Sequence, residues 1–212
     1  MKEELKFILA DDHAIVRRGL KQLLKEEFPK AFITEVGDAH SALDIVSVKE
    51  FDLLICDISM PGTTGLDLCK KVKRLKPELP ILILSMHKEE QYAIRALKAG
   101  ASGYLPKESA PEELIKAVRH ILAGKKYVSA SLAAIMVNHI GDQNQLELHE
   151  LFSDRELEVL KQIGKGNSLT EIGAKLNLSP NTISTYRSRI LDKMKMKSNA
   201  ELIRYIHEHK IS

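Results

Sequence analysis

The sequence predicts an α/β domain of the flavodoxin-like (βα)5 type, followed by a small all-α domain that contains a helix-turn-helix. Short apolar runs alternate with segments of helical periodicity through about the first 124 residues, as in a doubly wound parallel sheet. Four of these runs end at a polar or charged side chain, and in open α/β sheets ligands bind at the carboxyl ends of the strands. Beyond residue 150 the strand-like runs stop and serine-initiated helix caps recur.

The first domain is predicted to consist of five strand–helix pairs in sequence order. The strands are short apolar runs: Lys6–Ala10, Ala31–Val36, Leu53–Cys56, Ile81–Leu84 and Ser102–Leu105. The helices carry apolar residues at helical spacing: Ile15–Phe28, Ser41–Val48, Leu66–Leu75, Lys88–Ala99 and a segment from Pro111 to just before Gly124. The first strand is followed by Asp11-Asp12-His13 instead of a glycine-rich phosphate loop, which argues against a nucleotide-binding fold.

The second domain is predicted from four helix caps in about 60 residues. Each helix opens at a serine: Ser153, Ser168, Ser179 and Ser198. Between the domains the pattern loosens into a short helical piece at Leu132–Ile140 and the polar, turn-rich stretch GDQNQ. We therefore assign residues 1–124 to the first domain, 125–150 to a linker and 151–212 to the second domain.

Composition excludes several classes of protein. The chain is 44% hydrophobic and 29% charged, which is typical of globular proteins, and no apolar stretch approaches the length of a membrane span. The N-terminus does not resemble a signal peptide, so we expect a cytoplasmic protein without membrane association. The two cysteines, Cys56 and Cys69, have no metal-ligand spacing and suit small buried residues in a reducing compartment.

Side chains suited to phosphoryl chemistry end four of the predicted strands. They are Asp11 and Asp12 after the first strand, Asp57 after the third, Ser85 after the fourth and Lys107 after the fifth. Because the carboxyl ends of parallel strands meet at one edge of the sheet, we expect these side chains to share a cleft. Clustered carboxylates repel one another, and a Mg²⁺ ion with oxygen ligands would relieve that repulsion. Asp57 could then accept a phosphoryl group as an acyl phosphate.

The predicted helices at 168–176 and 179–194 are joined by Asn177-Leu178, a connection typical of a helix-turn-helix. From residue 150 onward the chain has 11 Lys+Arg against 8 Asp+Glu, and much of this excess lies in residues 179–197. One face of the second helix carries short polar side chains flanked by cations: Asn181, Ser184, Thr185 and Ser188, with Arg187, Arg189 and Lys193. Such a face suits base edges and phosphates of double-stranded DNA. The alternative is a helical interaction module whose basic helix is a solvated surface.

The first 124 or so residues resemble the receiver domain of two-component response regulators. The resemblance is carried by four stretches: ILADDHAIVRRGL, LLICDISMPGTTGLDL, ILILSMH and GASGYLPK. It implies a sensor histidine kinase as partner and the following roles: Asp57 as phosphoacceptor, Asp12 as direct metal ligand, Asp11 as a ligand partly through water, the backbone carbonyl of Ser59 as a further ligand, Ser85 and Tyr104 as switch residues, and Lys107 as the phosphate-binding ammonium. Many receivers have proline directly after this lysine, whereas here Pro106 precedes it and Glu108 follows, which puts the loop geometry in question.

The second domain resembles the LuxR-type helix-turn-helix through FSDRELEVLKQIGKGNSLTEIGAKLNLSPNTISTYRSRILDKMKMKSNAELIRYI. Together the two resemblances imply a response regulator of the NarL/FixJ class over almost the full length. Relatives often have lysine where Ser184 stands, so this chain could read a different sequence or rely more on phosphate contacts. A module with so few contacts would gain from a homodimer on paired half-sites. Candidate dimer residues lie on the last helix, where core packing is equally compatible: Leu202, Ile203, Tyr205 and Ile206.

We therefore predict a phosphorylation-dependent transcriptional regulator and not an enzyme. Two alternatives stay open at this point. A regulator that works without phosphorylation is disfavoured because the full set of acidic, hydroxyl and lysine side chains is present. A Mg²⁺-dependent phosphohydrolase that uses Asp57 as nucleophile would need a second acid or base and a substrate-covering cap, and the sequence offers neither.

Overall fold

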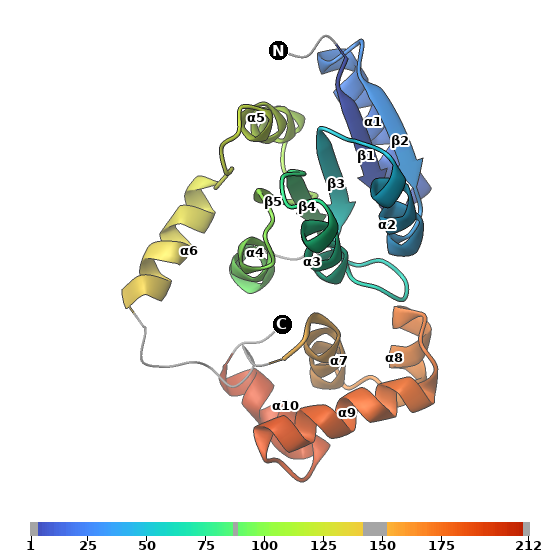
Figure 1. Ribbon diagram of the computed structural model, residues 1–212. Coiled ribbons are helices and arrows are strands. Elements are labelled where there is room, and N and C mark those ends of the chain that lie inside the picture. Colours follow the sequence, from blue (N-terminus) through green and yellow to red (C-terminus); the bar gives the residue numbers. More distant parts are fainter. Residues whose placement is uncertain (1–3, 87–88, 142–151, 210–212) are drawn as a thin grey trace. The chain divides into compact units, whose positions relative to one another are not determined.

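The computed structural model describes residues 4–86, 89–141 and 152–209 (Figure 1). The chain divides into two compact units, Met1–Gly141 and Asp142–Ser212, which are treated separately below. Residues 125–141, which the sequence assigned to a linker, belong to the first unit, whereas 142–150 lie outside the described residues. Within the described ranges, no helix has the length and apolarity needed to cross a bilayer.

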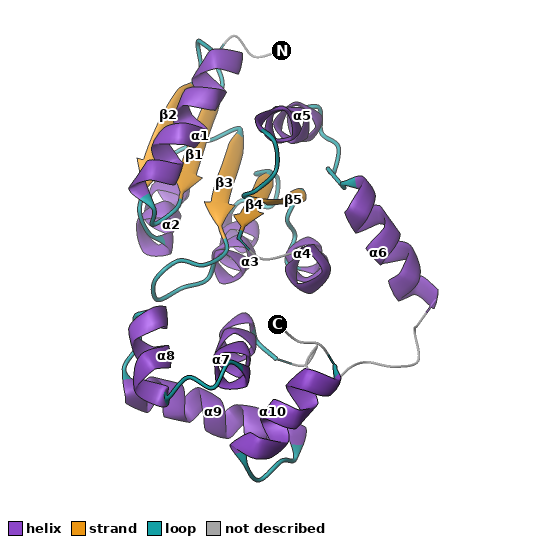
Figure 2. Ribbon diagram, turned by 180° about the vertical axis from the view of Figure 1, so that it is seen from behind, coloured by secondary structure: helices purple, strands orange, loops and turns teal. Residues whose placement is uncertain are grey.

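The first unit contains a parallel sheet whose strand order, β2-β1-β3-β4-β5, is that of a flavodoxin-like fold, as predicted (Figure 2, orange). The strands are β1 (Lys6–Ala10), β2 (Phe32–Val36), β3 (Leu53–Asp57), β4 (Ile81–Ser85) and β5 (Gly103–Pro106). The register pairs Ala10 with Cys56, Cys56 with Ile83 and Ile83 with Tyr104. The residues that follow these positions therefore lie side by side at one edge of the sheet.

Five helices connect and cover the strands: α1 (Ala14–Glu27), α2 (Ala39–Val48), α3 (Gly65–Leu75), α4 (Glu89–Lys98) and α5 (Pro111–Leu122). Side chains alternate along each strand, so Phe7 and Leu9 of β1 point to the same face as Leu53 of β3. That face forms one apolar core with Leu24 of α1 and Val118 of α5. Helices α2, α3 and α4 follow one another in contact, as expected for the other face of a doubly wound sheet.

A sixth helix, α6 (Ala130–Gly141), packs against α4 within the first unit. Its first turn is capped by Ser129, whose Oγ accepts a hydrogen bond of 3.0 Å from the backbone N–H of Leu132. The segment before it is attached to the sheet, because Tyr127 forms a bridge with Gly103 and its N–H donates to the carbonyl of Ser102 at 2.8 Å. Tyr127 is 4% exposed, so this connection is part of the folded core.

Residues 152–209 form four helices: α7 (Asp154–Gly164), α8 (Leu169–Leu176), α9 (Pro180–Met194) and α10 (Asn199–Glu208). All four begin after the predicted serine caps, and those at Ser153 and Ser168 are complete capping boxes. The turn between α8 and α9 is tight, since Asn177 is left-handed at φ 52° and a Cβ on Gly173 would lie 2.6 Å from the carbonyl oxygen of Leu178. Two helices joined by such a tight turn form a helix-turn-helix, as predicted for α8 and α9.

The apolar side chains of α10 contribute to the core of the second unit. Leu202, Tyr205 and Ile206 are buried, and Ile206 lies against Gly164 of α7. Ile203 is half-buried. Of the four residues considered as a dimer surface, three are therefore occupied in packing, and Ile203 keeps the most exposed surface.

Candidate functional site

Three of the residues predicted to share a site meet at the carboxyl edge of the sheet. Asp11 follows β1, Asp57 ends β3 and Lys107 follows β5. The Lys107 Nζ lies 2.6 Å from Oδ2 of Asp11 and 2.7 Å from Oδ2 of Asp57. Both carboxylates are almost fully buried, at 2% and 3% exposure. One ammonium thus bridges two carboxylates from different strands, and the sequence prediction that these three residues meet is matched by the geometry.

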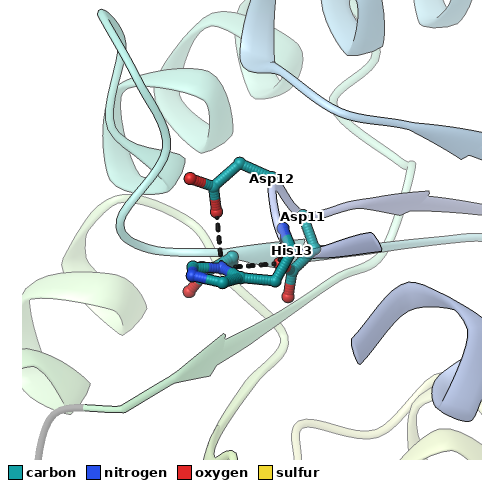
Figure 3. A group of neighbouring side chains, drawn as sticks. Asp11, Asp12 and His13 are labelled. Carbon is teal, nitrogen blue, oxygen red and sulfur yellow. Dashed lines mark hydrogen bonds and ion pairs between the residues drawn. The ribbon is translucent and has the colours of Figure 1, made fainter. Parts of the chain in front are cut away.

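The loop after β1 brings a third carboxylate, that of Asp12, and an imidazole to the same group of side chains (Figure 3). His13 donates its backbone N–H to Oδ1 of Asp11 at 2.8 Å, and its Nδ1 lies 2.7 Å from Oδ1 of Asp12. Sequence reasoning did not place His13 in this group. The available signal was its position directly after two strand-end aspartates.

The donor atoms fit a small divalent cation. Ligand atoms of Asp11, Asp12, His13 and Asp57 all lie within 4.8 Å of one another, and carboxylate oxygens are the ligands that Mg²⁺ prefers. Oδ1 of Asp57 is buried and has no hydrogen-bond partner among the described residues, so it is an acceptor that a cation or a phosphoryl group could satisfy. The backbone carbonyl of Ser59 stays a predicted ligand.

Burial and neighbouring charges shift the pKa values of Asp57 and Lys107 in opposite directions. Burial raises the pKa of Asp57, and the hydrogen bond and positive charge of Lys107 only partly offset that effect. For Lys107 burial lowers the pKa, but Asp11 and Asp57 outweigh burial and the net pKa is raised. Lys107 is therefore a permanent cation at neutral pH, while the Asp57 carboxylate would gain from further positive charge.

The start of α3 fixes the backbone of Asp57. Gly65 donates its N–H to the carbonyl of Ile58 at 2.8 Å, which closes the loop after β3. A Cβ at Gly65 would lie only 2.0 Å from the carbonyl oxygen of Asp57. No side chain other than hydrogen fits there without a backbone shift. Sequence reasoning missed Gly65, although a glycine at a helix start after a strand-end aspartate is consistent with a close approach.

The two predicted switch residues, Ser85 and Tyr104, are fully buried. Ser85 ends β4 and pairs with Pro106, and its carbonyl accepts the N–H of Lys107 at 2.7 Å. This pairing carries Lys107 into the cleft even though Pro106 precedes it, and the peptide bonds of the described residues are all trans. The unusual proline position therefore leaves the lysine in contact with Asp57. The switch roles of Ser85 and Tyr104 remain predictions.

A polar surface runs along α9. Asn181, Thr185, Ser188 and Arg189 are exposed and Ser184 is half-buried. Their spacing places Asn181, Ser184, Thr185 and Ser188 on one face. The Thr185 hydroxyl donates to the carbonyl of Asn181 at 3.0 Å. The residues predicted to read bases therefore share one face of α9, and their role in reading bases stays a prediction.

Two of the predicted DNA-contacting cations have partners inside the second unit. The Arg187 Nε donates to Oδ1 of Asn199 at 2.6 Å. The Lys193 Nζ lies 2.6 Å from Oε2 of Glu156 and 5.9 Å from the ring centroid of Phe152. Sequence reasoning could not find these pairings, because each joins different helices.

Glu156→Gln should lower stability by about 1 kcal/mol at pH 7, the scale of one hydrogen bond. Burial opposes ionisation of Glu156, but hydrogen bonds from Lys193 and Ser153 outweigh burial and lower its pKa below 4.5. Because the pKa of Glu156 is lower in the folded protein than in the unfolded chain, ionised Glu156 stabilises the fold at pH values above its unfolded-state pKa. This stabilisation is lost as the pH falls through the folded-state pKa. Thermal unfolding at pH 7 and at about pH 3 should therefore show a difference between variant and parent that shrinks in acid.

The exposed Glu208, 3.8 Å from Arg204, supplies the matched control Glu208→Gln, which should have little effect at either pH. A stability loss in Glu156→Gln that is the same at both pH values would contradict the assigned role of the charge.

Two family descriptions match the chain. "Response regulator receiver domain" covers residues 7–119, and "Bacterial regulatory proteins, luxR family" covers residues 150–206. The first range lies within the first compact unit and the second range within the second. Each family match therefore falls within one compact unit, although the matched ranges are shorter than the units.

Relatives match over nearly the whole length. The oxygen regulatory protein NreC of Staphylococcus epidermidis is 36% identical over 98% of this chain and 99% of its own length. The response regulator UvrY of Escherichia coli is 31% identical over 95% of this chain and 93% of its own length. Among solved structures, RcsB from Salmonella enterica serovar Typhimurium, bound to the promoter rprA in the presence of the phosphomimetic BeF3⁻, is 30% identical. It has a TM-score of 0.64 and covers 96% of this chain and 98% of that one.

Proposed function

This chain is a two-component response regulator of the NarL/FixJ class, with a receiver domain and a LuxR-type DNA-binding domain, and on that premise we propose that phosphorylation of Asp57 by a sensor histidine kinase controls its binding to DNA. The relatives are transcriptional response regulators and not enzymes, in agreement with the sequence prediction and against the phosphohydrolase alternative.

The observation that carries the proposal is the bridge from Lys107 to the buried carboxylates of Asp11 and Asp57. A cation held at a strand-end aspartate neutralises charge where a phosphoryl group would arrive. The Asp57 Oδ1, which is buried and without a hydrogen-bond partner, is the oxygen suited to attack. No comparable buried pairing of lysine with two strand-end carboxylates occurs elsewhere among the described residues.

In the proposed reaction, an oxygen of Asp57 attacks the phosphorus of a phosphohistidine. The bond between phosphorus and the imidazole nitrogen breaks, and the neutral imidazole leaves after taking up a proton. Lys107 would bind an oxygen of the transferred group, and we propose the Ser85 hydroxyl as a hydrogen-bond donor to another. Asp11, Asp12, Asp57 and the Ser59 carbonyl would hold Mg²⁺, which supplies further charge neutralisation when bound.

The acyl phosphate changes the charge of the cleft and biases Ser85, Tyr104 and the neighbouring surface toward a second arrangement. We propose that this change promotes a homodimer that binds paired DNA half-sites through α9, with Asn181, Ser184, Thr185 and Ser188 facing the bases. Arg187, Arg189 and Lys193 are the proposed cationic contacts, although Lys193 would have to leave Glu156. The RcsB structure bound to promoter DNA supports such a surface.

Removal of Mg²⁺ should abolish phosphorylation of the receiver by acetyl phosphate. The full-length chain, incubated with acetyl phosphate and Mg²⁺, should gain one phosphoryl group by mass spectrometry and bind promoter DNA more tightly in footprinting of genomic fragments. With EDTA both effects should disappear, because the single ammonium of Lys107 would then face three carboxylates and the incoming phosphoryl group. DNA binding that is equally tight with and without the phosphoryl group would favour a regulator independent of phosphorylation.

A further inference from the structure

The guanidinium of Arg187 is held by a side chain from the next helix. Arg187 lies in the middle of α9, and its Nε donates to Oδ1 of Asn199 at 2.6 Å. Asn199 is the first residue of α10, but the cap of α10 is Ser198, whose Oγ accepts from the backbone N–H of Glu201 at 3.3 Å. The Asn199 side chain is therefore not needed for capping, and its oxygen accepts the hydrogen bond from Arg187.

This bond leaves most of the guanidinium available. Arginine has five N–H donors in a rigid plane, and the bond to Asn199 uses the one at Nε. Within the described ranges, Nη1 and Nη2 of Arg187 make no hydrogen bond or ion pair with the protein. Four donors in a fixed plane match the oxygens of a phosphate group. Arg187 also lies one helical turn after Ser184, beside the proposed base-reading face.

Arg189 differs from Arg187 because its side chain is not held by another residue of the described ranges. Arg189 is exposed and makes no interaction within the described ranges, whereas Arg187 is half-buried and tied to α10. An untethered arginine loses side-chain freedom when it binds, and this entropy cost weakens the contact. A tethered arginine has lost part of that freedom already on folding, so more of its interaction energy reaches the complex.

We infer that Asn199 is a positioning residue for DNA binding, which fixes the Arg187 guanidinium so that Nη1 and Nη2 bind a backbone phosphate beside the groove that α9 enters. The inference rests on the DNA binding proposed above. It adds a residue outside the helix-turn-helix, Asn199, to the proposed DNA-binding set.

A purely structural link between α9 and α10 is the competing explanation, and salt dependence separates the two. Every phosphate contact that is lost lowers the steepness with which affinity falls as salt rises, whereas a loosened fold leaves that steepness unchanged. A phosphate contact is also independent of sequence, so a random-sequence duplex is a sufficient probe.

The test is a double-mutant cycle on the full-length chain, with affinity for a random-sequence duplex measured over a series of salt concentrations. Arg187→Met should reduce the slope of log affinity against log salt by about 1. Asn199→Ala should weaken binding about 3- to 10-fold, as expected for one arginine that must be ordered on binding. In the Arg187→Met background, Asn199→Ala should have no further effect.

Two controls match these variants. Arg204→Met removes an exposed cation of α10 whose ion pair spans 3.8 Å. Asn167→Ala removes an amide in the loop between α7 and α8 that donates to Gln162 of α7 at 2.7 Å. Both should keep wild-type affinity and slope, and thermal unfolding reports any loss of fold. An unchanged slope in Arg187→Met, or an equal loss from Asn199→Ala in both backgrounds, would overturn the inference. A DNA affinity that does not change on phosphorylation would overturn the proposed control of DNA binding. The double-mutant cycle would still test the role of Asn199, because it does not depend on phosphorylation.

Discussion

Asp57→Asn is expected to eliminate phosphorylation of the chain and, with it, the phosphate-dependent gain in DNA affinity. The amide lacks the carboxylate oxygen that attacks. Asp11 is also buried and in contact with Lys107, but its Oδ1 accepts the His13 N–H, whereas Oδ1 of Asp57 has no hydrogen-bond partner among the described residues. Incorporation from acetyl phosphate should fall to background by mass spectrometry, and footprints should be the same with and without the donor. The protein should stay folded, because burial already raises the pKa of Asp57 and disfavours its charged form.

Asp44→Asn is the matched control. Asp44 is exposed on α2, where its Oδ2 lies 2.9 Å from Nδ1 of His40. This variant should incorporate phosphoryl groups like the wild type. Phosphorylation of Asp57→Asn at the wild-type level would show that the receiving carboxylate lies elsewhere, and the proposed mechanism would then be abandoned.

Gly65→Ala should both destabilise the first unit and slow phosphorylation. The new Cβ would meet the carbonyl oxygen of Asp57 at 2.0 Å and its carbonyl carbon at 2.9 Å, so the strand end or the helix start must move. Forced shifts of this kind cost about 1–3 kcal/mol. Denaturant unfolding should report this loss. Phosphorylation should slow even in the fraction that is folded, because the displaced backbone carries the reacting carboxylate away from Lys107.

Gly19→Ala provides the contrast at another helical glycine. Gly19 lies in α1, and a Cβ there would meet nothing within 4 Å. Alanine should therefore stabilise the protein by about 0.5–1 kcal/mol through helix propensity. If both glycine variants changed stability alike, the close approach at Asp57 would not be the cause.

The fold could be predicted because its determinants are local. Short apolar runs between turn residues, such as Leu53–Cys56, indicate buried strands, and parallel pairing then brings Asp11, Asp57 and Lys107 to one edge. The serine caps of the second unit were equally readable, since each cap involves residues three positions apart.

Other features depend on which side chains meet after folding. The contact of Gly65 with Asp57 is set by where α3 begins, and the contact of Arg187 with Asn199 by how α10 packs on α9. Likewise, the sequence showed Lys193 only as one more cation in a basic stripe. Its bond to Glu156 joins residues that are 37 positions apart and lie on two different helices, so it follows from tertiary packing. Spacing along a chain does not encode such pairings.

The attachment of Tyr127 to the sheet has a consequence for aggregation. β5 is the last strand of the sheet, and an open strand edge is a template for pairing with another chain. The N–H of Tyr127 occupies the carbonyl of Ser102, and its bridge to Gly103 covers the same edge. A first domain cut at Gly124 would expose these backbone groups, whereas one that extends to Ser129 would keep them covered. The residues after α5 thus cover the start of β5, where another chain would otherwise pair.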